Sequence, residues 1–317
     1  MASRPTPLPP RLGPRFAVSA ARDAGVTPRR LRAGDLEAPF WGVRAHPFDP
    51  PERDGLADAD ARLLRHRIEA YAERIAPTRF FTGLSALVLW CDMLPVRPCP
   101  PLDVGVLAPE RTPRARGIRG HQVGRHLATV TECDGLPVTS PASTWATLAR
   151  DLPWRDLVAV GSLMVTPPRG PGGVIAGPAL TTLPALKAVT AAGSRTGVAA
   201  LRAAVPYVRV GARSRPEVHL FLAILQAGLA EPEFDVPVFD DAAALIGIFD
   251  LAYVGERVLV EYQGEYHRMS PTAWAADIRK SERAREAGWT VVQITRADLY
   301  PDPGAAVARV RRALSSR

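Results

Sequence analysis

The sequence is poor in several residue types. It has no asparagine, only two lysines (Lys187 and Lys280), and three cysteines, Cys91, Cys99 and Cys133. Three cysteines without a CxxC pair exclude a disulfide framework and argue against a zinc site. No run approaches the roughly 20 apolar residues of a membrane span, and the N-terminal stretch has no apolar core of a secretory signal. We therefore expect a cytoplasmic protein with reduced thiols and no membrane partner.

Other motifs are missing as well. No HExxH sequence, phosphate-cradling glycine loop or Ser-His-Asp arrangement is present, so protease and NTPase functions have no support. What the chain does have is arginine: its net charge is +8, which favours a polyanionic partner. Residues 1–130 carry 20 Arg against 13 Asp and Glu, whereas residues 214–317 carry 12 basic and 15 acidic residues. The basic charge therefore lies upstream and the acids gather near the C-terminus.

The N-terminal region shows the order helix, turn, basic helix, strand. Residues 1–14 are rich in Pro and Arg and are expected to be disordered. An Ala-rich helix should end near Gly25, and Thr27 can cap a second helix that carries Arg29, Arg30 and Arg32. This order is typical of a small winged helix-turn-helix over residues 15–50, which predicts DNA binding. A helical hairpin with a solvated basic face accounts for the same residues.

Residues 51–166 are predicted to form a mixed α/β region. LDVGVLAP reads as a strand, and RARGIRGHQV as a basic loop whose Arg116 and Arg119 are candidates for phosphate contacts. A solvated arginine-rich loop is the alternative. The Pro/Gly run at 166–178 predicts a boundary, followed by a linker with short helices over 167–212.

The last hundred residues have the clearest pattern. Ser214 and Glu217 form a capping box before an apolar helix. An edge-like strand, a hairpin around Gly255, a helix that stops at Gly288, a further strand and an amphipathic helix follow. The order α-β-β-β-α-β-α predicts a mixed sheet flanked by helices over residues 213–317.

Two strands of this region carry acids. Glu261 and Gln263 share one face of a strand, and Asp250 on the neighbouring hairpin strand can reach that face. Carboxylates that converge at the end of a sheet suit Mg²⁺ (or Mn²⁺), which can activate water for attack on a phosphodiester. In this interpretation the acids hold the metal and Gln263 hydrogen-bonds the water or the phosphate. Solvated acids on an exposed face are the alternative.

These residues resemble the PD-(D/E)XK nuclease superfamily, and within it the very-short-patch-repair (Vsr)-like endonuclease domains found in many actinobacterial proteins. The matching pieces are S-x-x-E at 214–217, FDLAY at 249–253, VEYQGEYHR at 260–268, W-x2-D-x-R at 274–279 and GWTVVQIT at 288–295. The resemblance covers about a third of the chain, and it implies a magnesium-dependent endonuclease or nickase acting on DNA.

The resemblance also implies roles for single residues. Asp250 and Glu261 would be metal ligands, with Glu217 as a candidate third. His267 would be a general acid or base, and Asp277 and Arg279 would support the site or neutralise the phosphate. The sequence departs from the family at Gln263, because the third motif residue is usually a lysine.

Upstream, residues 16–45 and GLPVTSPASTWATLA at 135–149 resemble, more loosely, the AbiEi-type antitoxins. That resemblance implies an alternative function: a DNA-binding transcriptional regulator in which the nuclease fold is catalytically silent. It leaves open a partner toxin or a homodimer.

Overall fold

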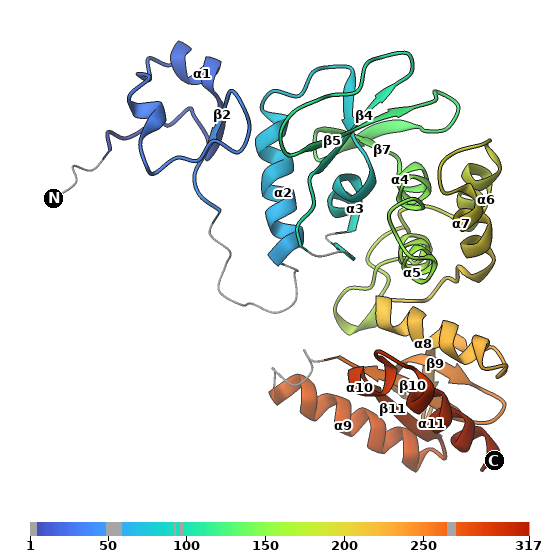
Figure 1. The fold of residues 1–317 in the computed structure, drawn as a ribbon. Coiled ribbons are helices and arrows are strands. Elements are labelled where there is room, and N and C mark those ends of the chain that lie inside the picture. Colours follow the sequence, from blue (N-terminus) through green and yellow to red (C-terminus); the bar gives the residue numbers. More distant parts are fainter. Residues whose placement is uncertain (1–4, 49–58, 92, 96–97, 265–270, 317) are drawn as a thin grey trace. The chain divides into compact units, whose positions relative to one another are not determined.

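The computed structural model describes residues 5–48, 59–91, 93–95, 98–264 and 271–316. It divides into two compact units, Met1–Leu148 and Ala149–Arg317. Each unit contains helices and strands, so the chain is an α/β multidomain protein, as its sequence pattern predicted (Figure 1). Within the described ranges, no helix is long and apolar enough to cross a bilayer.

The first unit begins with a small antiparallel ribbon. Its elements are β1 (Arg15–Ala17), α1 (Val18–Asp23), η1 (Arg30–Arg32) and β2 (Val43–Ala45). Phe16, Ala21, Val26 and Leu31 form its apolar core, and Leu8 and Leu12 pack against that core. Part of the stretch expected to be disordered therefore has a packed position.

The second helix expected after Thr27 is not observed. Only the single 3₁₀ turn η1 forms there, with Leu31 as its one buried residue. The segment between Thr27 and Gly34 is too short to hold a helix without a broad apolar face. The helix-turn-helix element of the winged-helix prediction is thus reduced to one helix and one turn.

A five-stranded mixed sheet fills the rest of the first unit, with the strand order β5-β4-β3-β7-β6. Its elements are α2 (Ala59–Ala72), β3 (Arg79–Phe81), α3 (Gly83–Cys91), β4 (Leu102–Leu107), β5 (Ile118–Val123), β6 (Val130–Cys133), β7 (Leu136–Thr139) and α4 (Pro141–Leu148). The prediction of a basic loop at 114–123 was wrong in its second half, because Ile118–Val123 pairs in parallel with β4.

The second unit begins with a helical layer. Its elements are α5 (Trp154–Val165), η2 (Pro171–Gly173), α6 (Leu183–Ala191), α7 (Val198–Ala204), η3 (Val205–Tyr207) and α8 (Arg215–Gln226). Asp156 on α5 accepts hydrogen bonds from Arg215 at 2.5 and 3.0 Å and lies 2.9 Å from His219, both on α8. Because the second compact unit spans Ala149–Arg317, the segment 167–212 that was predicted as a linker lies inside it.

The four-stranded sheet of the second unit has the order β11-β10-β9-β8. The remaining elements are β8 (Glu233–Phe239), β9 (Leu245–Tyr253), β10 (Val258–Gln263), α9 (Pro271–Glu286), β11 (Thr290–Thr295), α10 (Arg296–Leu299) and α11 (Gly304–Ser315). Strands β8, β9 and β10 are antiparallel in turn, and β11 runs parallel to β10. Helices α8 and α11 contact each other and β10, whereas α9 packs on β9 and β11 (Figure 1).

Local signals explain why these elements begin and end where they do. The Ser214 hydroxyl accepts the backbone N–H of Glu217 and so starts α8. Gly288 adopts a φ of +82° just after α9, a conformation that suits glycine at a helix end. The predicted edge strand, hairpin, helices and final strand are all confirmed, and together they form the mixed sheet flanked by helices that the pattern predicted.

Candidate active site

The sheet of the second unit forks between β9 and β10. Backbone pairing of the two strands covers Leu251–Tyr253 with Val258–Val260 and then stops. Beyond that point β9 pairs with β8, and β10 continues along β11. The carboxylate of Asp250 lies in the fork, where its Oδ2 accepts the backbone N–H of Tyr262 at 2.8 Å. A side chain thus satisfies a strand N–H at the opening of the sheet.

Glu261 faces a lysine across this fork. Lys280, on α9, forms an ion pair with the buried Glu261 carboxylate and donates to the backbone carbonyl of Ile248 at 2.6 Å. Its ammonium also lies 4.2 Å from the centre of the Phe249 ring. Lys280 therefore links both arms of the fork.

A glycine makes room for this lysine. A Cβ built on Gly247 would lie 2.9 Å from the methylene carbons of Lys280, closer than real Cβ atoms approach. Glycine within a strand often marks such a close approach. The lysine is thus held by contacts along its whole length: its stem lies over Gly247 of β9, and its ammonium contacts Ile248 of β9 and Glu261 of β10.

The two acids of the fork are strongly perturbed. Burial raises the pKa of Asp250 to about 7, with a further rise from the nearby charge of Glu217. Burial also raises the pKa of Glu261 to about 7; the ammonium of Lys280 opposes the rise, and the charge of Asp250 adds to it. Neighbouring acids whose pKa values are strongly perturbed are a common mark of a functional site.

Glu217 has two roles in the structure. Its backbone N–H is part of the α8 N-terminus, and its Oε2 accepts the backbone N–H of Arg213 at 2.8 Å. Burial raises its pKa. The charge of Glu217 also raises the pKa of Asp250. Glu217, at the start of α8, is therefore a third carboxylate that acts on the fork.

The remaining predicted site residues are placed less centrally. Asp277, one helical turn before Lys280, raises the pKa of both Asp250 and Glu261 through its charge, after the larger effect of burial. Gln263 is partly buried at the end of β10, and Arg279 is exposed on α9. His267 lies outside the described residues.

The donor set has the chemistry of a hard-cation site. Asp250 and Glu261 offer carboxylate oxygens, which Mg²⁺ and Mn²⁺ prefer. Among the residues that the structure describes, no three His, Cys, Asp or Glu side chains are arranged to hold a metal together. A cation in the fork would therefore bind to these two carboxylates and complete its shell with water, as Mg²⁺ commonly does.

Some of the predicted DNA-binding arginines are held in ion pairs, and others are exposed to solvent. Arg30 forms a two-pronged pair with Asp35 at 2.8 and 2.7 Å, while Arg29 and Arg32 are exposed. Arg119 forms a similar pair with Asp103, described next, and Arg116 is exposed at the rim of a pocket.

Asp103 is a fully buried charge in the sheet of the first unit. Arg119 donates to its two oxygens at 2.6 and 2.9 Å, and His121 Nε2 lies 2.6 Å from Oδ1. The Leu84 N–H, at 3.0 Å, also binds this carboxylate. Burial by itself raises the pKa of Asp103, but the hydrogen bonds and charges of His121 and Arg119 outweigh it and lower the pKa below its usual value. Arg119 thus has a structural role in addition to its predicted phosphate contact.

Sequence reasoning missed Lys280 and Gly247. One signal was present: Lys280 is one of only two lysines in an arginine-rich chain, and it follows Asp277 by three residues on a predicted helix. Its partner Glu261 is 19 positions away, on another element. No spacing rule connects those two positions, so only the fold brings the ammonium to the carboxylate.

Comparison with known proteins finds distant relatives. The chain is 28% identical over 120 residues to two uncharacterized proteins of Mycobacterium tuberculosis, Rv2248 of strain H37Rv and MT2308 of strain CDC 1551. The matched region covers 38% of this chain and 44% of each relative, so the chain spans less than half the length of the curated relatives it matches. No family model and no solved structure matches.

Proposed function

We propose that the second unit is a metal-dependent phosphodiester hydrolase acting on DNA, as an endonuclease or nickase. The observation that carries the proposal is the fork, where Asp250 and Glu261 converge under one lysine and both titrate near neutrality. The resemblance of this region to PD-(D/E)XK nucleases supports it, as does the succession α8, β8, β9, β10, α9, β11 around one mixed sheet.

Each residue of the fork has a chemical task in this proposal. Asp250 and Glu261 would hold Mg²⁺ or Mn²⁺, which, when bound, supplies an activated water and neutralises charge on the phosphate. The Tyr262 N–H fixes the orientation of the Asp250 carboxylate, and the Ile248 carbonyl fixes the ammonium of Lys280. Positioned groups of this kind lower the cost of reorganisation during the reaction.

Lys280 supplies the charge that Gln263 lacks. Its ammonium lies at the Glu261 carboxylate, which is where a scissile phosphate would be placed if Glu261 takes part in metal binding. Lysine provides a compact point charge with rotatable donors, so it can turn from Glu261 toward a phosphate oxygen. The departure from the family pattern at Gln263 would then be compensated from a different element.

A second candidate function is the antitoxin-like regulator that binds DNA without cutting it. Two observations favour it: Glu261 already has a counter-charge in Lys280, and the described residues offer no three-ligand metal group. In this case the fork would be an ion pair that stabilises the sheet, and DNA binding would depend on residues 16–45.

The two functions are separated by measuring binding and cleavage on the same variants. Glu261→Gln removes one charge but keeps the size of the side chain. A nuclease with this substitution loses cleavage in Mg²⁺ and retains DNA binding in EDTA, measured by mobility shift. A regulator shows no cleavage in either protein, and its sequence-specific binding is lost only when the exposed Arg29 and Arg32 are replaced by Gln.

A further inference from the structure

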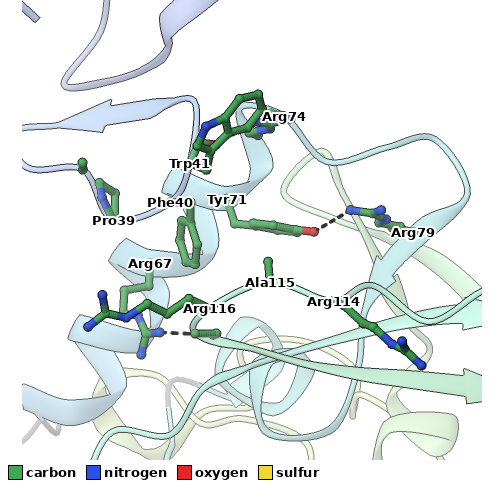
Figure 2. Close-up of a pocket in the computed structure, with 12 residues that line it drawn as sticks. Pro39, Phe40, Trp41, Arg67, Tyr71, Arg74, Arg79, Arg114, Ala115 and Arg116 are labelled. Atoms are coloured by element: carbon green, nitrogen blue, oxygen red, sulfur yellow. Dashed lines mark hydrogen bonds between the residues drawn. The ribbon is translucent and has the colours of Figure 1, made fainter.

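A pocket of about 800 Å³ lies within the first unit, and its lining includes no residue of the fork. Its lining combines five arginines with the aromatic rings of Phe40, Trp41 and Tyr71, and it includes no acidic side chain. Figure 2 shows the arginines placed around the aromatic side chains. Five guanidinium groups in one recess predict an anionic ligand with several charges.

Four segments build this pocket. Arg67, Tyr71 and Arg74 lie at positions i, i+4 and i+7 of the α2 segment and its end, so they share one face. Phe40 and Trp41 come from the turn before β2, β3 contributes Arg79, and the loop before β5 contributes the arginines at 114 and 116. The spacing on α2 is visible in the sequence, whereas the meeting of the four segments is not.

The pocket arginines have no acidic partners among the described residues. Arg67 donates to the carbonyls of Pro100 and Gly117 at 2.9 and 3.3 Å, and Arg79 donates to the Tyr71 hydroxyl at 2.9 Å. These neutral acceptors orient the guanidinium groups but leave their charges uncompensated (Figure 2).

Neighbouring arginines of the same unit behave differently. Arg15 pairs with Glu69 at 2.6 Å and Arg65 with Asp134 at 3.6 Å. Arg114 and Arg116, in contrast, are exposed at the pocket and form no ion pair with a described carboxylate. Positive charge is thus concentrated where a ligand can reach it.

An exposed tryptophan lies at the rim. The Trp41 side chain is 87% exposed, and the guanidinium of Arg74 lies 4.7 Å from its ring. Phe40 and Tyr71 are buried below it, with ring centroids 5.2 Å apart in an edge-to-face arrangement. Trp41 is therefore a large aromatic surface on a packed base, beside several unpaired positive charges.

We propose that this pocket binds an unpaired DNA strand, with the arginines holding successive phosphates and a base stacked on Trp41. Arginine grooves with exposed aromatic rings are the usual means of binding single strands, because every base offers a face for stacking. A duplex cannot present a base face to Trp41 without unpairing, and a lone phosphate would engage only part of the charge. The inference rests on the proposed function only for the choice of DNA as the ligand.

The test is equilibrium binding of a fluorescein-labelled oligo(dT) strand to the full chain in EDTA, where metal-dependent cleavage does not occur. Trp41→Ala should weaken binding by about 5- to 150-fold, the effect typical of one stacked base. Trp41→Phe should retain most of the wild-type affinity, because phenylalanine can still stack on a base. Because the ring is exposed, neither variant disturbs the core.

The charge contribution is measured by salt dependence. The double variant Arg114→Gln/Arg116→Gln should lower the slope of log affinity against log salt by about 0.7 for each lost phosphate contact. Arg125→Gln is the matched control, because Arg125 is exposed in the same unit but does not line the pocket. Its slope is expected to fall by less.

Two results would overturn the inference. One is binding of the strand by the Trp41→Ala and Arg114→Gln/Arg116→Gln variants as tightly as by Arg125→Gln. The other is equal affinity for a duplex of the same length with no effect of Trp41→Ala. If the wild type shows these binding effects but does not cleave DNA in Mg²⁺, the nuclease proposal is refuted and the pocket assignment stands.

Discussion

The substitution Asp250→Asn should stabilise the protein at neutral pH in the absence of metal. Burial and the charge of Glu217 raise the pKa of Asp250 from 3.8 to about 7. The unfolded chain therefore loses this proton at a lower pH than the folded protein does. Between the two pKa values, ionisation favours unfolding, so the wild type loses stability as the pH rises from about 4 to about 7.

The size of the effect follows from the distance between the two pKa values. Each unit of difference between the folded and unfolded pKa corresponds to about 1.4 kcal/mol, so full ionisation of Asp250 opposes folding by about 4 kcal/mol. Asparagine carries no charge, and its amide oxygen can still accept the N–H of Tyr262. We expect a gain of about 2 to 4 kcal/mol in the free energy of unfolding at pH 8, and almost none at pH 4.

Urea denaturation at a series of pH values in EDTA measures this gain. Asp235→Asn is the matched control, because asparagine also tolerates the positive φ of 61° at that position. Burial by itself raises the pKa of Asp235, but hydrogen bonds from Arg213 and Arg169 outweigh it and lower the pKa. Asp235→Asn should therefore destabilise the protein at pH 8. A loss of stability in Asp250→Asn at pH 8 would refute the account of the fork as a site of repelling charges.

Three further predictions concern the fork and the first unit. Lys280→Met removes the counter-charge of Glu261, so its stability loss in urea should be larger at pH 8.5 than at pH 5; an equal loss would contradict the ion pair. Gly247→Ala should displace Lys280 and reproduce the pH-dependent stability loss of Lys280→Met, whereas Gly255→Ala, with open space around its Cβ, should be neutral. Asp103→Asn removes the buried carboxylate charge that Arg119 and His121 contact and should destabilise the first unit by about 1.5 to 3 kcal/mol, measured as faster hydrogen exchange in β4; unchanged exchange would contradict a structural role.

The elements of residues 214–317 were predictable because local signals and long patterns agreed there. The cap at Ser214, the turn around Gly255 and the stop at Gly288 each fixed an element boundary. Strand alternation then placed Glu261 correctly on a buried strand beside Asp250. The acids of the candidate site could be found in the sequence because they lie on adjacent, well-marked strands.

Predictions failed where local pattern was weak. The basic segment after Thr27 has one apolar residue, Leu31, that the fold buries, which is too little to support a second helix. The segment 114–123, with three arginines and two glycines, predicts a loop, but parallel pairing with β4 holds Ile118–Val123 as a strand. Tertiary pairing overrode local composition in this second segment.

Lys280 and the arginine pocket were not recognised in the sequence for the same physical reason. Lys280 reaches Glu261 because α9 packs on β9, and the arginine pocket exists because a turn, a helix, a strand and a loop converge. Neither arrangement has a fixed spacing in the sequence. Side-chain clusters built from three or more elements require the fold before they can be recognised.

The central claim is that the fork with Asp250 and Glu261 cuts DNA with the help of a divalent metal. The most direct measurement is the rate of nicking of supercoiled plasmid by the full chain with Mg²⁺ or Mn²⁺, compared with the Asp250→Asn variant and with EDTA. The account predicts metal-dependent nicking by the wild type that is absent in the variant and in EDTA, while the variant remains at least as stable as the wild type. Nicking by Asp250→Asn at the wild-type rate, or none by the wild type with either metal, would contradict it.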